Sequence, residues 1–185
     1  MLIMLGLISQ LAYGQWTLDN DASRLSFVTI KADHVAEVHT FDLLSGSISS
    51  SGQAEITIEL VSINTLIEIR DERMQNLLFE TSIFPEATVT ASVDANRIAA
   101  LGAGQTLIEP LQFELAMHGG SNSYTTDVLI TRTDTGVIVS TLSPVIVNAN
   151  SFDLVQGVEA LREVAGLPRI SNAVPVSFTV SFNGN

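Results

Sequence analysis

The stretch Ser62–Val93, SINTLIEIRDERMQNLLFETSIFPEATVTASV, sets a charged helical segment between two strand patterns. Apolar and polar side chains alternate just before it, over residues 56–60 (ITIEL), and again at its end, over residues 89–93 (VTASV). A period of two indicates a strand with one buried face. Between the strands, residues 70–73 are all charged, and apolar residues then follow at helical spacing. The stretch therefore predicts a β protein in which a short amphipathic helix, residues 70–80, covers part of the fold.

The same alternation recurs along most of the remaining chain. It is strictest over residues 174–182, where Val and Phe alternate with Pro, Ser and Thr. A second amphipathic helix is expected over residues 154–164, where apolar residues recur at intervals of three and four, and Gly166 and Pro168 end it. Gly46 is expected to mark a bend or a bulge. The other predicted strands cover residues 16–19, 24–31, 38–49, 54–61, 87–97, 107–117, 124–133, 137–142 and 145–148.

This pattern predicts an all-β chain of about eight longer strands, the two short segments 16–19 and 145–148, and two short helices. Half-buried antiparallel strands in this number form either a sandwich or a closed barrel. Alternation alone does not separate these two architectures. No shift in composition and no internal repeat divides the chain, so a single domain is expected.

Residues 1–14, MLIMLGLISQLAYG, carry no charge and end with small residues at Ala12 and Gly14. This arrangement is typical of a secretory signal peptide that is cleaved before Gln15, and the apolar run is too short to span a bilayer. A buried N-terminal strand is the alternative interpretation. With a signal peptide, residues 15–185 form the mature domain, and the protein is periplasmic or secreted.

The composition excludes several classes of function. The chain has 20 acidic and 8 basic residues and a formal net charge of −12. So few cations argue against nucleic-acid binding, because phosphate contacts need Lys and Arg. An anionic membrane surface would repel the protein, and an integral membrane protein is not expected. There are no cysteines, so disulfides and thiolate chemistry are excluded, and the stability must come from the apolar core.

The residues form no recognisable catalytic or metal-binding motif. Neither a G-x-S-x-G nucleophile sequence nor a phosphate-binding glycine loop occurs. His34 and His39 flank Glu37, but a spacing of five residues on a strand places the two rings on opposite faces. We therefore predict no metal, no cofactor and no catalysis. An enzyme is a competing hypothesis, and it requires a His and a carboxylate within hydrogen-bond reach in a pocket.

The helical segment has a structural and a functional interpretation. Arg70 is one of few cations and stands beside Asp71, so a specific partner is expected. The partner is either a carboxylate, in a salt bridge that orients the helix, or a ligand head group at the mouth of a cavity. Met74, Leu78 and Phe79 either pack in the core or cap an apolar lumen, where Met adapts well to an irregular ligand.

Several stretches, taken in order, resemble the YceI-like family of polyisoprenoid-binding, lipocalin-like periplasmic proteins. The opening strands match the family with Phe27, Phe41 and Gly46 at its characteristic positions. The resemblance covers nearly all of the mature chain. The stretch 33–37 (DHVAE) departs from the family pattern as an additional acidic and histidine-containing segment. The matching stretches are SRLSFVTIK (23–31), EVHTFDLLSGSI (37–48), AEITIELVSINTLIEIRDERM (54–74), LLFETSIFPEATVTASV (77–93), NSFDL (150–154) and VPVSFTVSF (174–182).

This resemblance implies a single extended antiparallel β-barrel of about eight strands with an elongated apolar lumen. It implies an exported, non-enzymatic carrier whose partner is a long-chain lipid, an isoprenoid or a quinone. The alternative is a stress-related binding module with a filled barrel, which contacts a protein or glycan through surface loops. The oligomeric state stays open, a homodimer included. The residues expected to contact the lipid are Phe27, Phe41, Arg70, Asp71, Met74, Leu78, Phe79, Phe113 and Phe178.

Overall fold

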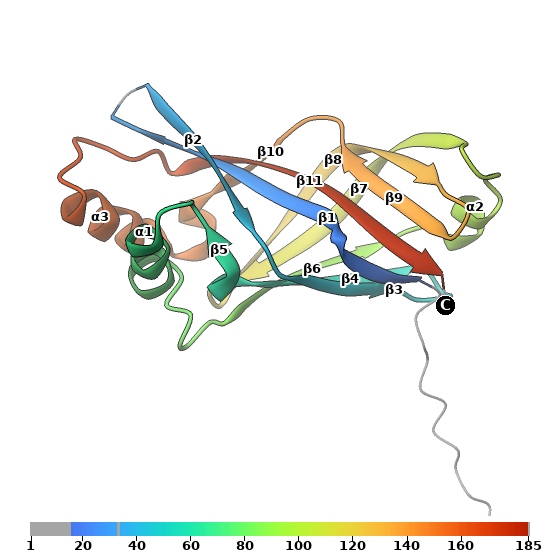
Figure 1. Cartoon of the computed structure of the whole chain (residues 1–185), viewed down its shortest axis with the longest axis horizontal. Coiled ribbons are helices and arrows are strands. Elements are labelled where there is room, and N and C mark those ends of the chain that lie inside the picture. Colours follow the sequence, from blue (N-terminus) through green and yellow to red (C-terminus); the bar gives the residue numbers. More distant parts are fainter. Residues whose placement is uncertain (1–15, 33, 185) are drawn as a thin grey trace, which may run out of the picture.

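Eight antiparallel strands close into a barrel because the last strand, β11 (Ala173–Gly184), pairs with β9 on one side and with β1 on the other. The computed structural model describes residues 16–32 and 34–184, so the signal peptide predicted over residues 1–14 lies outside the described residues. The predicted barrel is confirmed (Figure 1). The ring consists of β1 (Trp16–Lys31), β3 (Leu44–Ile48), β4 (Gln53–Glu59), β6 (Glu86–Ser92), β7 (Thr106–Met117), β8 (Gly120–Arg132), β9 (Gly136–Thr141) and β11.

Three further strands lengthen the wall at one end of the barrel. These are β2 (Val35–Phe41), β5 (Ile63–Asn64) and β10 (Val145–Asn148). The start of β1 pairs with β3 and its second half pairs with β2, while β10 pairs with the start of β11. The segments 16–19 and 24–31 therefore belong to one strand with a register shift between them, and the predicted strand 38–49 is two strands, β2 and β3.

Helices lie at both ends of the barrel. Helix α1 (Glu68–Arg73) continues into a π-helical turn, Met74–Leu78, and α3 (Val155–Val164) packs against that turn. Figure 1 shows α1 and α3 together at one end and α2 (Ala95–Ala99) at the other. Short 3-10 turns, Leu60–Ser62 and Ala149–Phe152, lead into β5 and toward α3.

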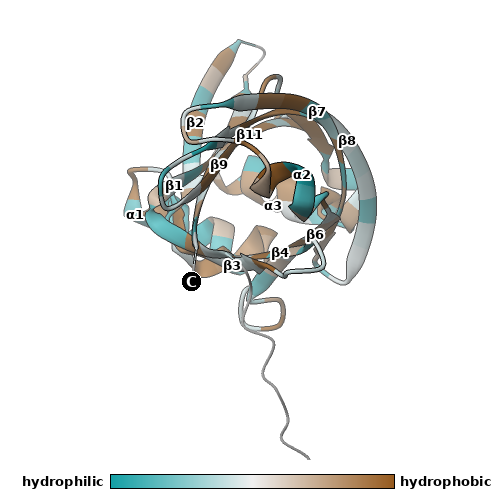
Figure 2. Cartoon of the chain, turned by 90° about the vertical axis from the view of Figure 1, so that its right-hand side faces the viewer, coloured by the Kyte–Doolittle hydropathy of each residue, from teal (hydrophilic) through white to brown (hydrophobic). Residues whose placement is uncertain are grey.

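The predicted strand over residues 87–97 is too long, because β6 ends at Ser92 and α2 begins soon after. The Asp94 carboxylate accepts a hydrogen bond from the Arg97 backbone N–H at 3.0 Å, which caps the first turn of α2. Figure 2, viewed from the α2 end, shows the closed ring of strands with the helices across it. Ile98 of α2 is 1% exposed and belongs to the buried apolar core, as do Val137 and Phe182.

Gly46 lies within regular antiparallel pairing, opposite Ile56, so the expected bend or bulge is wrong. A Cβ atom at this position would lie 2.4 Å from the Glu55 carbonyl oxygen. The physical requirement is therefore close approach of two strands, which any larger side chain would push apart.

Candidate functional site

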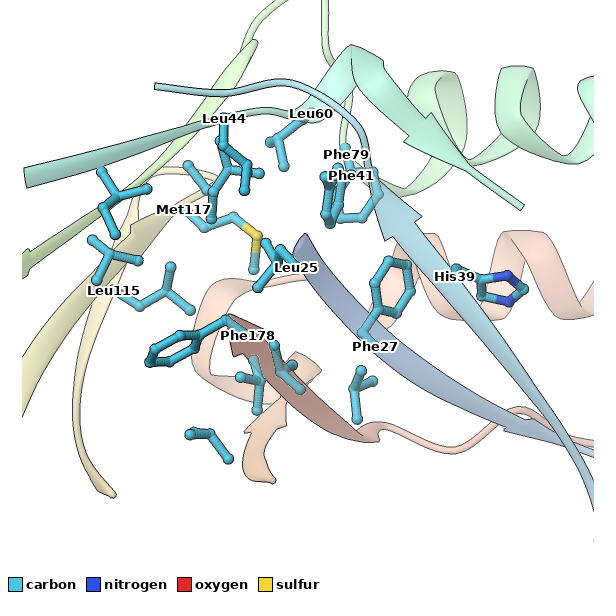
Figure 3. A pocket seen from close by; sticks show the side chains of 18 of the residues that line it. Leu25, Phe27, His39, Phe41, Leu44, Leu60, Phe79, Leu115, Met117 and Phe178 are labelled. Atoms are coloured by element: carbon cyan, nitrogen blue, oxygen red, sulfur yellow. The ribbon is translucent and has the colours of Figure 1, made fainter. Parts of the chain in front are cut away.

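The inner faces of the strands enclose a cavity of about 340 Å³, within the range of ~300–1,000 Å³ typical of small-molecule sites. Its wall is almost entirely aliphatic and aromatic, and Figure 3 shows these side chains pointing into the lumen from opposite strands. A barrel filled by side chains, the alternative raised from the sequence, does not match this lumen. The polar side chains that line it are Thr29, Lys31, Glu37, His39, Arg70, Arg73 and Ser171.

Eight of the nine residues predicted to contact a ligand line this cavity. Asp71 is not among the lining residues. The structure places the other eight residues on the cavity wall, whereas contact with a ligand stays a prediction for all nine. The eight are Phe27 of β1, Phe41 of β2, Arg70 of α1, Met74 and Leu78 of the π-helical turn, Phe79, Phe113 of β7 and Phe178 of β11.

An aromatic surface runs from the strands to the helical end of the cavity. The rings of Phe27 and Phe41 stack with centroids 5.4 Å apart, and Phe41 meets Phe79 edge-on at 5.7 Å. His39 completes this surface, with its ring 5.4 Å from that of Phe27. Aromatic contacts of this geometry favour a fixed arrangement of the wall beyond what apolar burial alone provides.

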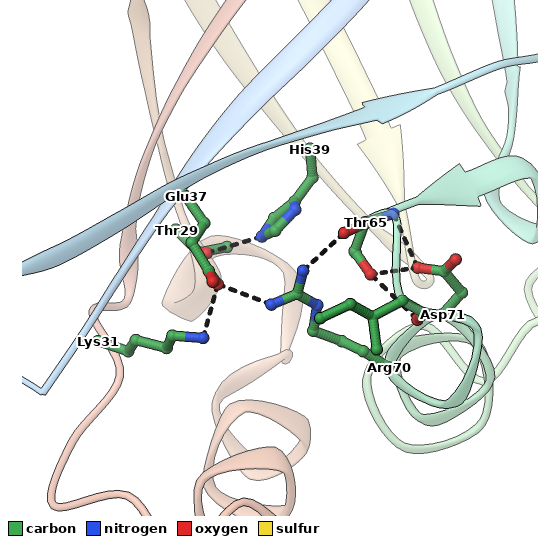
Figure 4. Close-up of polar contacts among 8 residues, drawn as sticks. Thr29, Lys31, Glu37, His39, Thr65, Arg70 and Asp71 are labelled. Atoms are coloured by element: carbon green, nitrogen blue, oxygen red, sulfur yellow. Dashed lines mark hydrogen bonds and ion pairs between the residues drawn. The ribbon is translucent and has the colours of Figure 1, made fainter.

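A network of charged groups fastens α1 to the β1–β2 hairpin (Figure 4). The Glu37 carboxylate accepts from Lys31 Nζ at 2.6 Å and from Arg70 Nη1 at 2.7 Å. The hydrogen bond from Lys31 lowers the pKa of Glu37, the charge of Arg70 acts in the same direction, and burial opposes both. Glu37 therefore stays ionised between two cations at the α1 end of the lumen.

Arg70 and Asp71 do not pair with each other, although both contact Thr65. The second terminal nitrogen of Arg70, Nη2, donates to the Thr65 carbonyl at 2.6 Å. The Asp71 carboxylate accepts from the Thr65 backbone N–H at 2.8 Å and from the Thr65 hydroxyl. These contacts hold the turn ahead of α1, so Asp71 has a structural role and Arg70 both orients the helix and faces the cavity.

His39 is a cavity residue that the sequence reasoning missed. It is 3% exposed, and its Nε2 lies 2.9 Å from the Thr29 hydroxyl. Burial lowers the pKa of His39, and the nearby Arg70 charge lowers it further, so the ring is neutral at pH 7. The sequence contained a signal for this position. Residues 37, 39 and 41 are spaced by two along one strand, so their side chains lie on the same face, and an inward Phe41 implies that Glu37 and His39 also point inward.

The other histidines lie away from this network. His34 is exposed in the β1–β2 turn, and His118 lies 2.9 Å from the Glu80 carboxylate, outside the cavity lining. The histidine in the cavity, His39, bonds a hydroxyl rather than a carboxylate. The pair required by the enzyme hypothesis is therefore not formed in the pocket. Within residues 16–32 and 34–184, no group of three or more His, Asp or Glu could hold a metal ion.

A barrel with an apolar lumen and polar groups at one end defines a binding protein for an amphiphilic molecule. The YceI-like domain family matches residues 16–182, and the chain belongs to this family. A comparison with curated protein sequences gave no match. No helix in the described part of the chain is long and apolar enough to cross a membrane.

Solved structures give the same fold. A polyisoprenoid-binding domain from Saccharophagus degradans shares 38% identity and superposes with a TM-score of 0.91, covering 94% of this chain and 100% of that domain. BcnA from Burkholderia cenocepacia shares 16% identity with a TM-score of 0.69, covering 89% of this chain and 98% of BcnA. The YceI protein of Campylobacter jejuni shares 16% identity with a TM-score of 0.57, covering 80% of this chain and 84% of that protein. The last two show similarity of fold alone.

Proposed function

We propose that this protein is an exported, non-enzymatic carrier that holds a long-chain isoprenoid or quinone-type lipid in its barrel. The observation that carries the proposal is the single lumen, apolar along its length and polar only at the α1 end. An amphiphile with one polar head and a long apolar chain matches this division. The similarity to a polyisoprenoid-binding domain supports the isoprenoid class.

The driving force is the removal of apolar surface from water, which contributes about 25 cal/mol per Å². A chain in the lumen contacts the inward faces of β4, β6 and β7, including Ile58, Val89 and Leu115. It also contacts α3 through Leu154 and Val158, which line the helical end. Because the wall consists of strands on all sides, a linear chain is enclosed along its length.

The segment expected at residues 1–14 supports export to the periplasm or the cell exterior. Between membranes, a lipid that is almost insoluble in water needs a protein to cross the aqueous space. No catalytic pair lies in the cavity among the described residues, so holding and releasing the lipid is the activity that we propose.

Extraction of lipid from protein purified out of its native host, followed by mass spectrometry, tests the proposal. The expected result is one dominant isoprenoid or quinone-type lipid, present at about one molecule per barrel. A parallel experiment offers isoprenoid lipids to delipidated protein and measures uptake. Native material without lipid, together with no uptake in vitro, would falsify the carrier function. Cell fractionation tests the export separately.

A further inference from the structure

The turn ahead of α1 exposes three large aliphatic side chains within four residues. Leu66 is 89% exposed, Ile67 is 47% exposed and Ile69 is 53% exposed. Single apolar residues on a surface are ordinary, whereas a group of neighbouring ones marks a contact with something outside the protein. We refer to Leu66, Ile67 and Ile69 as the apolar tip.

The backbone of Leu66 makes its exposure more informative. Its φ angle is +62°, in the left-handed region that favours Gly and Asn and strains a bulky side chain. An exposed turn with this conformation ordinarily contains one of those two residues. Leu66 is therefore unfavourable for the backbone and for solvation alike, and it is not part of the apolar core. Folding gives no reason for a Leu at this position, so its side chain serves a contact outside the chain.

Hydrogen bonds within the protein hold the tip in this conformation. The Leu66 backbone N–H donates to the Asn64 side-chain oxygen at 3.0 Å. The Thr65 carbonyl accepts from Arg70 Nη2 at 2.6 Å (Figure 4), and the Ile67 carbonyl accepts from the Arg70 backbone N–H at 2.9 Å. These backbone groups are satisfied, so the tip can enter an apolar medium without leaving them unpaired.

The apolar tip lies beside an opening of the lumen. Arg70 and Arg73, on the helix that follows the tip, both line the cavity. The lining at this end also includes Lys31, which is partly exposed, and Ala165, which is exposed. The lumen therefore reaches the surface between α1, α3 and the β1–β2 hairpin, which Figure 1 shows at the same end of the barrel. A lipid that leaves through this opening passes next to the tip.

We propose that the apolar tip inserts into the interfacial region of a lipid bilayer and holds the mouth of the lumen against the membrane during lipid exchange. This inference rests on the proposed lipid-carrying function and adds the surface with which the carrier exchanges lipid. A protruding turn with three aliphatic side chains is small for a protein interface, which buries ~800 Å² per partner. It suits shallow insertion among lipid head groups, where each apolar side chain contributes separately.

Charge determines which membrane the tip can enter. Glu68 lies between Ile67 and Ile69 and is exposed, so its carboxylate keeps the insertion shallow. The chain has a net charge of −12, and anionic head groups repel it. The expected partner is therefore a bilayer surface rich in zwitterionic lipid, and apolar contact rather than electrostatic attraction drives the binding.

Binding of the full-length mature protein to phosphatidylcholine vesicles tests the proposal directly. Flotation with the vesicles measures the affinity. Ile69→Trp places a fluorophore in the tip, and its emission is expected to shift to the blue and to be quenched by brominated lipids. Trp16 is 3% exposed and gives a constant background. Replacing part of the phosphatidylcholine by phosphatidylglycerol is expected to weaken the binding, and added salt to restore it, because salt screens the repulsion.

Leu66→Asn separates membrane contact from folding. Asn is similar in size to Leu, tolerates the left-handed conformation and is polar. The affinity for vesicles is expected to fall about tenfold, while the melting temperature stays the same or rises. Ile108→Thr is the matched control, because Ile108 of β7 is 59% exposed on the outer wall and Thr keeps the β-branched shape. That change is expected to leave vesicle binding unaltered.

Three outcomes would overturn the membrane contact. The wild type does not float with phosphatidylcholine vesicles, or Leu66→Asn binds them as tightly as the wild type, or Ile108→Thr loses as much affinity as Leu66→Asn. A dimer in sedimentation that Leu66→Asn abolishes, without vesicle binding, would assign the tip to a second copy of the chain instead.

Uptake of an isoprenoid added in ethanol, without vesicles, tests the carrier function independently. Leu66→Asn is expected to take up the isoprenoid as well as the wild type does, and to deliver it to vesicles more slowly. Uptake without vesicle binding would overturn the membrane contact and leave the carrier function standing. Vesicle binding without uptake would overturn the carrier function, while the contact between the tip and the bilayer stands.

Discussion

Glu37 of β2 and Arg70 of α1 are 33 positions apart in the sequence and are joined by an ion pair of 2.7 Å. The pair fastens the helix over the polar end of the lumen, and Lys31 contributes a second cation to the same carboxylate. All three side chains are roughly one-quarter to one-third exposed. The network therefore contributes more than a fully exposed surface pair, for which ~0–1 kcal/mol is usual.

Glu37→Gln is expected to lower the free energy of unfolding by about 1 kcal/mol at pH 7, because two cations lose their carboxylate. The pKa of Glu37 is lowered in the folded protein by the Lys31 hydrogen bond and the Arg70 charge. Its stabilisation is thus complete above the ordinary carboxylate pKa of about 4.3 and is lost as the pH falls through the lower, folded value. Urea denaturation at pH 7 and in this acid range measures both effects.

Glu159→Gln is the matched control, since Glu159 pairs with Arg162 at 2.6 Å on the exposed side of α3. That change is expected to alter the stability little. An equal loss in both variants, or an unchanged acid dependence in Glu37→Gln, would show that the network does not hold α1.

The buried His39 is expected to make the stability of the protein depend on pH in a second way. Burial and the Arg70 charge lower the pKa of His39 in the folded state, so the unfolded chain binds more protons between that value and about 6.5. The stability of the protein is therefore expected to fall as the pH drops below about 6.5, until the folded pKa is reached. His39→Phe should remove this dependence. The measurement is the slope of the free energy of unfolding against pH between pH 7.5 and 5.5, because altered packing changes that free energy equally at every pH. Identical slopes in the wild type and in His39→Phe would contradict the prediction.

The width of the lumen depends on small residues of the wall. Ala91 of β6 lies opposite Ala54 of β4, and both line the cavity. Ala91→Phe places a ring in open space, so the fold is expected to survive while lipid uptake falls by about tenfold or more. Uptake of a fluorescent isoprenoid by delipidated protein, with the melting temperature recorded alongside, measures both. Thr90→Phe, at the neighbouring exposed position, is expected to leave uptake unchanged; an equal loss there would place the effect outside the lumen.

Local patterns predicted the strands well and the closure of the barrel not at all. The predicted strand 145–148 coincides with β10, and the predicted strand 174–182 lies within β11. Closure depends on pairing between β1 and β11, such as Trp16 with Gly184, and alternation within a strand contains no information about so distant a partner. The resemblance to the YceI-like family, rather than the periodicity, supplied the barrel.

The polar end of the cavity was predictable only in part. Arg70 was noticed because cations are rare in the chain, yet its partner Glu37 was not, since no local rule connects positions so far apart. The helix itself was predicted over residues 70–80, whereas α1 begins at Glu68 and continues as a π-helical turn to Leu78. Spacing of apolar residues does not distinguish that wider turn from an α-helix.

Gly157 of α3 determines how closely the two helical segments at this end approach each other. A Cβ atom there would lie 2.6 Å from the Leu77 carbonyl oxygen and 2.8 Å from Leu78 Cα. Ala is favoured over Gly within helices by about 1 kcal/mol, but contact with backbone atoms forces the segments apart. Gly157→Ala is therefore expected to lower the free energy of unfolding by about 1–2 kcal/mol, as overpacking does.

Because Leu78 and Val158 both line the cavity, the same change is expected to speed the release of bound lipid. Release of a fluorescent isoprenoid into vesicles, together with chemical denaturation, measures the two effects. Gly102→Ala is the control, because a Cβ there would approach only the flexible Gln105 side chain, at 3.4 Å. If Gly157→Ala proves more stable than the wild type and releases lipid at the same rate, α3 and the π-helical turn separate without cost, and the helices do not close this end of the lumen.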